Sequence, residues 1–246
     1  MQRNVFKLST QYKKSWNYFD FQKWIIEGSP IIKTVKTLNL SYKNLYAIPS
    51  QITKLPNLEN LKVSNSNLTE LPKQLESLSN LKTVNCSMNN IKELPNFIYN
   101  FEEFNCNMND IYTLPKKNNI EPKIKKLDCS WNNITKLPEE FHKFTNLKYL
   151  DCSYNEFYNL FNLHYLNLNF LNCSFNKIKY TELLYLTKYL WFHNKNNKQI
   201  TDMLRTNFKD CLKSYLKLDT IDKLRLEIPE NIKTFEDVEK LEINFY

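Results

Sequence analysis

The chain has 246 residues, of which 42% are hydrophobic and 24% are charged, and its net charge is +8 at pH 7. Its single glycine, Gly28, excludes glycine-rich phosphate loops, nucleophile elbows and dinucleotide-binding fingerprints, because each motif needs glycine where the backbone bends or approaches a ligand. No apolar run reaches membrane-spanning length and the first 30 residues contain no signal-peptide core, so we expect an intracellular protein, cytoplasmic or otherwise, that is not secreted.

Residues 1–34 are expected to form an N-terminal helical cap. Within this segment, residues 15–27 place four large apolar side chains among Lys, Asp and Gln, which is the pattern of an amphipathic helix: Trp16, Phe19, Trp24 and Ile25. A stack of repeats leaves an apolar face open at each end, and that face must be covered. We therefore predict that this helix covers the first repeat.

Residues 35–198 repeat one pattern of apolar residues with a period close to 23 residues. If the first apolar residue is position 1, positions 4 and 6 are also apolar, position 9 is usually Asn, and a Leu-Pro pair often follows. Seven copies, called repeats 1 to 7, begin at Val35, Leu58, Leu81, Phe101, Ile124, Leu147 and Leu168. A degenerate further copy begins at Thr187. A fixed period over so much of the chain determines its architecture.

This pattern resembles that of the leucine-rich repeat family, LxxLxLxxNxL followed by xxLP. Repeats 3 and 5 match it most clearly, although they carry Cys at position 6, where the family more often has Leu. The resemblance implies an α/β solenoid, a curved right-handed superhelix with a parallel sheet on its concave face. It implies short helical or irregular returns on the convex face. It also implies that the protein works by binding a protein or peptide.

The residues themselves support this architecture. Positions 4 and 6 alternate with polar neighbours, as in a strand with one buried face, and short strands of this kind must stack to share a core. Apolar residues at helical spacing follow Pro49, Pro72 and Pro138, which predicts a helical turn in each of these returns. The return after Pro115 begins with residues 116–119, Lys-Lys-Asn-Asn, and is predicted to be irregular.

Cysteine and asparagine recur at fixed positions of the repeats. Position 6 is Cys in repeats 3 to 7: Cys86, Cys106, Cys129, Cys152 and Cys173. These sulfurs should form a line with a spacing of about 4.8 Å, which cannot surround a tetrahedral metal, so we interpret them as small core residues, with a redox or metal role as the alternative. The position-9 asparagines are predicted to satisfy backbone groups at the strand ends. We expect no cofactor, no metal and no catalytic residue.

Residues 199–246 follow the array. Residues 199–218 carry apolar side chains at helical spacing, which predicts a C-terminal cap helix. The segment from Ile221 to Ile243 echoes positions 1, 4 and 6 twice, which leaves open whether the array continues as two shortened repeats.

Positions 3, 5, 7 and 8 are predicted to point away from the core, over the sheet and its rim. In the later repeats these positions gather aromatic side chains: Trp131, Tyr149, Tyr154, Phe170, Phe175, Tyr189 and Trp191. Asp128 and Asp151 share position 5 of repeats 5 and 6, so they should stand side by side on the sheet. Exposed aromatics beside two acids are typical of a binding hot spot, and we predict that these nine residues contact a partner. The alternative is that the position-8 aromatics pack against the next repeat and are structural.

The charge of the chain is uneven. Residues 1–54 carry +7 and residues 177–225 carry +6, whereas residues 55–176 carry −1. We predict a non-catalytic protein-interaction module that binds a protein or peptide on the concave face. The alternative is binding of nucleic acid or an acidic partner by the basic flanks, although the neutral repeat body and the two acids disfavour nucleic acid. Neither a membrane nor a small-molecule substrate is evident as a partner.

Overall fold

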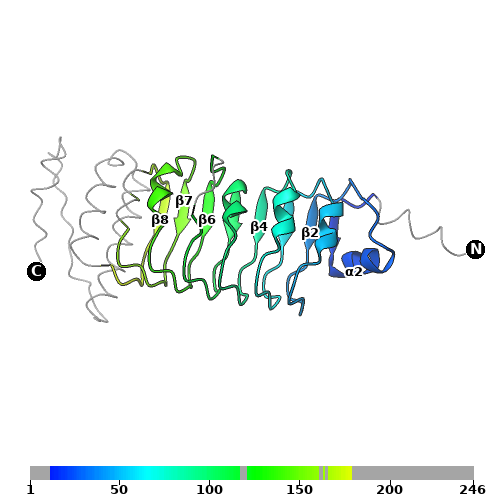
Figure 1. The fold of residues 1–246 in the computed structure, drawn as a ribbon, viewed down its shortest axis with the longest axis horizontal. Helices are drawn as coiled ribbons and strands as arrows, with labels where there is room; N and C mark the ends of the chain where they lie inside the picture. Colours follow the sequence, from blue (N-terminus) through cyan, green and yellow to red (C-terminus); the bar gives the residue numbers. More distant parts are fainter. Residues whose placement is uncertain (1–11, 117–120, 161–162, 164–165, 179–246) are drawn as a thin grey trace, which may run out of the picture.

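The computed structural model describes residues 12–116, 121–160, 163 and 166–178. These residues form one sheet of eight parallel strands, arranged in space in the order β1 to β8 (Figure 1). The strands are β1 Ser15–Asn17, β2 Thr37–Asn39, β3 Asn60–Lys62, β4 Thr83–Asn85, β5 Glu103–Asn105, β6 Lys126–Asp128, β7 Tyr149–Asp151 and β8 Phe170–Asn172. Strands β2 to β8 are positions 3 to 5 of repeats 1 to 7, so the predicted stack of parallel strands is confirmed.

One hydrophobic core runs through the whole stack. Adjacent strands pair in register, so that position 4 of each repeat lies beside position 4 of the next, as in the pairing of Leu61 with Val84 and of Leu127 with Leu150. These four side chains are at most 2% exposed and belong to a single buried cluster. The predicted core shared by the stacked strands is therefore present.

The returns contain short 3₁₀ helices, all drawn on the same side of the sheet in Figure 1. They are η1 Ser50–Lys54, η2 Lys73–Ser77, η3 Asn96–Asn100 and η4 Glu139–Lys143. Each follows directly after a proline, whose fixed φ suits the start of a helical turn. The helical turns predicted after Pro49, Pro72 and Pro138 are confirmed. The turn η3 was not predicted, although Ile98 and Phe101 follow Pro95 at the same spacing as the apolar pairs in the other three returns.

The return of repeat 4 continues after Pro115 with four polar residues, 116–119, and a side chain from repeat 3 packs across it. The described residues 106–116 and 121–125 contain no helix, in agreement with the irregular segment predicted after Pro115. Tyr99, in the return of repeat 3, packs edge-on against Phe144 in the return of repeat 5, with ring centroids 4.5 Å apart. Its hydroxyl donates a hydrogen bond to the carbonyl oxygen of Pro115 at 2.9 Å. The side chain of Tyr99 therefore contacts the returns of both repeat 4 and repeat 5.

The N-terminal end is closed by β1 and by helix α2, Tyr18–Ile26, which lies at the end of the stack in Figure 1. The prediction of one helix over 15–27 was wrong at its start, because residues 15–17 add a strand beside β2. Asn17 ends this strand and caps α2, since its side chain accepts hydrogen bonds from two backbone N–H groups of the first turn. Trp16 and Trp24 are buried as expected, but Phe21 is the third buried ring, whereas Phe19 is 70% exposed.

Two further points complete the fold. No helix among the described residues has the length and apolar character needed to cross a bilayer. The predicted cap helix and shortened repeats of residues 199–246, and the copy beginning at Thr187, lie outside the described residues.

Candidate partner-binding surface

The backbone turns off each strand through a left-handed residue. Position 8 has a positive φ, between 48° and 61°, in all seven repeats: Tyr42, Asn65, Met88, Met108, Trp131, Tyr154 and Phe175. Of these residues only Asn65 belongs to a type that is enriched at positive φ, whereas bulky side chains are outliers there. This conformation costs roughly 1–2 kcal/mol for an ordinary residue. Six of the seven repeats therefore hold a large side chain where a smaller one would be less strained.

In repeats 5 to 7 the position-8 side chains form a stack of rings, here called the rim column (Trp131, Tyr154 and Phe175). The centroids of Trp131 and Tyr154 are 3.9 Å apart with planes 10° from parallel, and those of Tyr154 and Phe175 are 4.2 Å apart with planes at 14°. Trp131 remains 51% exposed and Phe175 41% exposed. The rings thus contact one another along the rim, yet much of the column faces solvent.

A second pair of rings, here called the sheet column, lies at position 3 of β7 and β8. Tyr149 and Phe170 stack with centroids 4.2 Å apart and planes 5° from parallel, and both are partly exposed. The ammonium group of Lys126, at position 3 of β6, lies 4.8 Å from the centroid of the Tyr149 ring. This distance is within the range of cation–π attraction. The exposed face of the sheet column therefore already holds one cation.

Position 5 lies between the two columns in sequence and carries Asp128 and Asp151 on adjacent strands. The Oδ1 atom of Asp128 accepts hydrogen bonds from the Ser130 hydroxyl at 2.7 Å and the Ser130 N–H at 3.1 Å. The Oδ1 atom of Asp151 is bonded by Ser153 in the same way, at 2.6 and 3.0 Å. The two acids are side by side, as predicted, and each also holds the chain as it leaves the strand.

The second oxygens of these carboxylates point toward opposite neighbours. Asn105 and Asn107 each donate to Oδ2 of Asp128 at 3.3 Å, and Asn172 donates to Oδ2 of Asp151 at 3.2 Å. Position 5 therefore forms an acidic row, in the order amide, carboxylate, carboxylate, amide (Asn105, Asp128, Asp151 and Asn172). Within the described part of the chain, no lysine forms an ion pair with either carboxylate.

The pKa values reflect this crowding. Burial raises the pKa of the Asp128 carboxyl; the Ser130 hydrogen bonds lower it, and the charge of Asp151 raises it further. The pKa of the Tyr149 hydroxyl is raised by burial and by the charges of Asp151 and Asp128. The negative charge of the acidic row thus raises the pKa of a residue in the neighbouring sheet column.

The prediction that position 7 points outward was wrong for four repeats. Ser87, Ser130, Ser153 and Ser174 are at most 7% exposed, because each hydroxyl donates to the side-chain oxygen at position 5 of its own repeat. A small polar residue is needed here so that the chain can turn beneath the position-5 side chain. The surface is therefore made by positions 3, 5 and 8.

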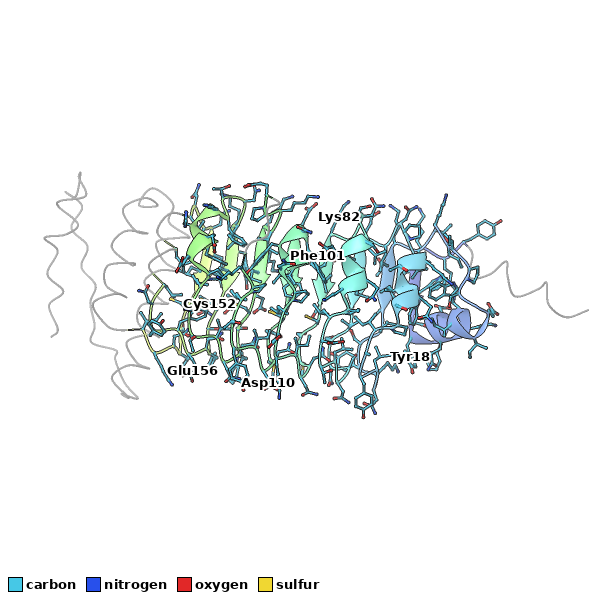
Figure 2. All side chains as sticks on the ribbon, in the orientation of Figure 1. Tyr18, Lys82, Phe101, Asp110, Cys152 and Glu156 are labelled. Carbon is cyan, nitrogen blue, oxygen red and sulfur yellow. The ribbon has the colours of Figure 1, made fainter. Side chains whose placement is uncertain are left out.

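Beneath this surface lie the position-6 cysteines and the position-9 asparagines, and the interpretation of the cysteines as small core residues is confirmed by their burial. The five cysteines are buried and none of them is in a disulfide bond; Cys152 is labelled in Figure 2. Burial raises the pKa of Cys106, Cys129 and Cys152 well above the usual range of a thiol, which keeps them protonated. Among the described residues there is no group of three or more His, Cys, Asp or Glu side chains that could hold a metal ion.

The position-9 asparagines join each repeat to the one before it. The side-chain amide of Asn132 donates to three carbonyl oxygens, those of Cys106, Cys129 and Ser130, at 3.0–3.1 Å. Its side-chain oxygen accepts the N–H of Ile111 at 3.0 Å. Asn89, Asn109, Asn155 and Asn176 bond in the same pattern. The predicted role of these residues in satisfying backbone groups is confirmed.

The same face of the early repeats is different. At position 3, Asn60 donates to the Thr37 hydroxyl at 3.4 Å and accepts from the Thr83 hydroxyl at 2.7 Å, forming a chain of polar contacts across β2, β3 and β4. At position 8 of repeats 1 and 2, Tyr42 carries a ring but Asn65 does not, so no ring stack forms between these two repeats. The structure thus brings together five of the seven predicted aromatics and both acids in repeats 5 to 7, whereas Tyr189 and Trp191 lie outside the described residues.

Comparison with known proteins identifies the fold. A family model described as Leucine Rich Repeat matches residues 123–144. The functional domain of InlJ from Listeria monocytogenes, which includes a cysteine ladder, is similar with a TM-score of 0.53 and 23% identity, covering 65% of this chain and 33% of that chain. This chain has the leucine-rich repeat fold.

Two further leucine-rich repeat structures are similar. Internalin InlF from Listeria monocytogenes has a TM-score of 0.51 and 20% identity over 64% of this chain and 46% of its own. The protein LIC12759 from Leptospira interrogans has a TM-score of 0.51 and 24% identity over 73% of this chain and 57% of its own. This chain thus spans between one third and three fifths of the length of these three structures. Comparison with curated protein sequences finds no match.

Proposed function

We propose that this leucine-rich repeat protein is a non-catalytic interaction module, which binds a protein or peptide partner on the face of repeats 5 to 7. The observation that carries this proposal is the rim column, in which three large rings are held at positive φ and remain partly exposed. Rigid arrays of this kind present their outward side chains at fixed spacing, so binding requires little ordering of the array.

The energetics of the rim column favour a role outside the fold. A stacked aromatic pair contributes about 0.5–1.5 kcal/mol beyond its buried area, whereas the left-handed backbone costs roughly 1–2 kcal/mol for each ring-bearing residue. The rim column has two stacked pairs and three left-handed residues, so stacking contributes about 1–3 kcal/mol against a backbone cost of about 3–6 kcal/mol. Repeat 2 forms the same turn with Asn65, which suits the conformation better. Stability therefore gives no reason to place Trp131, Tyr154 and Phe175 at position 8, whereas partner binding does.

The composition of the surface fits the same role. Aromatic side chains give large contact areas with little loss of conformational entropy, and they are enriched where binding energy is concentrated. The two columns and the acidic row together supply five rings and two carboxylates on three adjacent strands.

The experiment is a capture assay with the immobilised full-length chain and an extract of its source cells. Trp131→Asn removes one exposed ring and places at position 8 the residue type that repeat 2 already uses. We expect this variant to lose the partners that the wild type retains. Tyr42→Asn is the matched control, because it makes the same kind of change at the same position of repeat 1, at a residue that is 71% exposed. Equal capture by Trp131→Asn and the wild type would contradict the proposal.

A further inference from the structure

The face of repeats 5 to 7 combines three features that together define the chemistry of its occupant. Two columns of stacked rings lie at positions 3 and 8, and the acidic row lies at position 5 between them. Adjacent strands of a sheet are about 4.8 Å apart, so the side chains of Asp128 and Asp151 extend from backbone positions that are one strand spacing apart. We propose that this face binds a peptide segment through an arginine side chain, whose guanidinium group bridges Asp128 and Asp151 between the two ring columns. This inference rests on the proposed function and specifies its partner.

Charge complementarity supports a basic occupant. The two carboxylates turn their Oδ2 atoms toward Asn105 and Asn172, and no hydrogen bond joins one carboxylate to the other. The charge of Asp151 raises the pKa of Asp128, which shows that the pair repels itself when both are ionised. A cation placed between them would relieve this repulsion. Residues 55–176, which contain this strip, carry a formal charge of −1, so the excess positive charge of the chain lies outside them.

The ring columns favour arginine over lysine. Guanidinium is planar, stacks on aromatic faces and presents a fork of donors to carboxylates, whereas ammonium is a compact point charge. The ring face in the sheet column already attracts a cation, since the ammonium of Lys126 lies 4.8 Å from the Tyr149 centroid. The rim column offers a second aromatic wall on the far side of the row.

The occupant is peptide and not nucleic acid. Stacked rings can bind the bases of a single strand, but such proteins combine them with a basic groove that tracks the phosphates. On this face the only lysine at the positions that form the surface of β6 to β8 is Lys126, and it is outnumbered by Asp128 and Asp151. A phosphate chain lying along the acidic row would meet two carboxylates and only this one lysine.

The test begins with selection of binding peptides from a phage-displayed library of random twelve-residue peptides, with the full-length chain as bait. We expect the selected peptides to be enriched in arginine relative to the unselected library. One such peptide is then synthesised and its affinity is measured by isothermal titration calorimetry. Replacing its arginine by lysine should weaken binding several-fold, and replacing it by alanine should weaken binding at least about tenfold, as expected for a close charge pair.

Variants of the protein locate the binding site. Asp128→Asn combined with Asp151→Asn keeps the shape of the acidic row, because asparagine already occupies position 5 in repeats 3, 4 and 7. This double variant should bind the same peptide at least about tenfold more weakly than the wild type does. The control combines Glu70→Gln with Glu76→Gln, which removes the same charge from exposed residues off the open face and should change affinity less than about threefold.

The outcomes separate this inference from the proposed function. If the selected peptides show no arginine enrichment, or if their affinity is insensitive to the double asparagine variant, the arginine site is wrong. If the Trp131→Asn variant then fails to bind those same peptides, the proposed function still stands. If this variant binds them as the wild type does, both the arginine site and the proposed function are wrong. Failure to select any peptide, or tighter binding of a twenty-nucleotide oligothymidylate than of any peptide, also overturns the inference.

Discussion

Repeats 1–3 and repeats 5–7 share one backbone but present different surfaces. Both sets place buried apolar residues at positions 4 and 6, and both turn off the strand through a residue with positive φ. On the open face, the early repeats join Thr37, Asn60 and Thr83 by hydrogen bonds, whereas the later repeats stack Tyr149 on Phe170 and Trp131 on Tyr154. Since one backbone accepts both surfaces, the rings of the later repeats are not a requirement of the fold.

The largest expected effect comes from breaking what the two regions share. Asn132→Ala would remove four hydrogen bonds and leave the N–H of Ile111 without an acceptor, whereas the carbonyl oxygens of Cys106, Cys129 and Ser130 each keep one other donor. A buried polar group left unsatisfied costs about 1–3 kcal/mol and each further lost hydrogen bond about 0.5–1.5 kcal/mol, so we expect a loss of about 3 kcal/mol. Urea unfolding monitored by circular dichroism measures this loss.

The control for Asn132→Ala is Asn44→Ala. The side-chain oxygen of Asn44 accepts one hydrogen bond, from the side-chain amide of Asn67, and Asn44 is exposed. Its loss should change stability by less than about 1 kcal/mol. If the two variants unfold at the same urea concentration, the asparagines of position 9 do not hold the repeats together.

A smaller effect is expected at position 6, where the early and later repeats use different residues for one purpose. Cys129 is fully buried, and the equivalent residue of repeat 2 is Val63, which is buried as well. Cys129→Val should therefore change the free energy of unfolding by less than about 1.5 kcal/mol, the usual range for exchanges of similar volume in a core. A change above about 3 kcal/mol in calorimetric unfolding would show that the thiol has a role beyond filling space.

The exposed rings should affect stability less than the core does. Trp131→Asn loses one ring stack and relieves part of the left-handed strain, so we expect a net change within about 1 kcal/mol, or a shift in melting temperature of about 4 °C at most. Differential scanning calorimetry of the variant measures it. A destabilisation above about 3 kcal/mol would assign the rim column to the core and remove the main support for a binding face.

The smallest effect concerns the pH dependence of stability. Because burial raises the pKa of Asp128 in the folded state, its contribution to stability is present below its unfolded pKa, near 3.8, and is lost as the pH rises through the raised value. Asp128→Asn removes this loss, so the stability of the variant relative to the wild type should be higher at pH 7 than at pH 3. Melting temperatures of both proteins at the two pH values test it, and an equal difference at both would contradict the assignment.

The sequence predicted the parts of the molecule that follow from periodicity. Position 4, the cysteine line and the asparagines of position 9 recur at fixed spacing, and their environments are as expected. The same reasoning missed strand β1, because residues 15–17 precede the periodic region and contain one apolar residue, Trp16. It also missed the turn η3, because Ile98 and Phe101, which have the spacing of the other returns, lie within the nearly continuous apolar run of residues 97–101.

The surface was predicted only in part. Alternation along a strand indicates which residues face outward, so positions 3 and 5 and the pairing of Asp128 with Asp151 could be expected. The burial of the position-7 serines could not, because it results from hydrogen bonds to position 5 within the same turn. The positive φ of position 8 could not either, because six of its seven residues are not types that signal a left-handed backbone.

The most direct test measures the accessibility of Trp131 while a partner is bound. Trp16 and Trp24 are 1% and 3% exposed, so with Trp191 replaced by Phe the iodide-quenchable emission comes from Trp131, which is 51% exposed. Addition of a captured partner or a selected peptide at saturation should reduce the quenching constant at least about twofold, because binding buries the centre of the contact surface. An unchanged quenching constant with the partner fully bound would show that the rings of repeats 5–7 are not the binding surface.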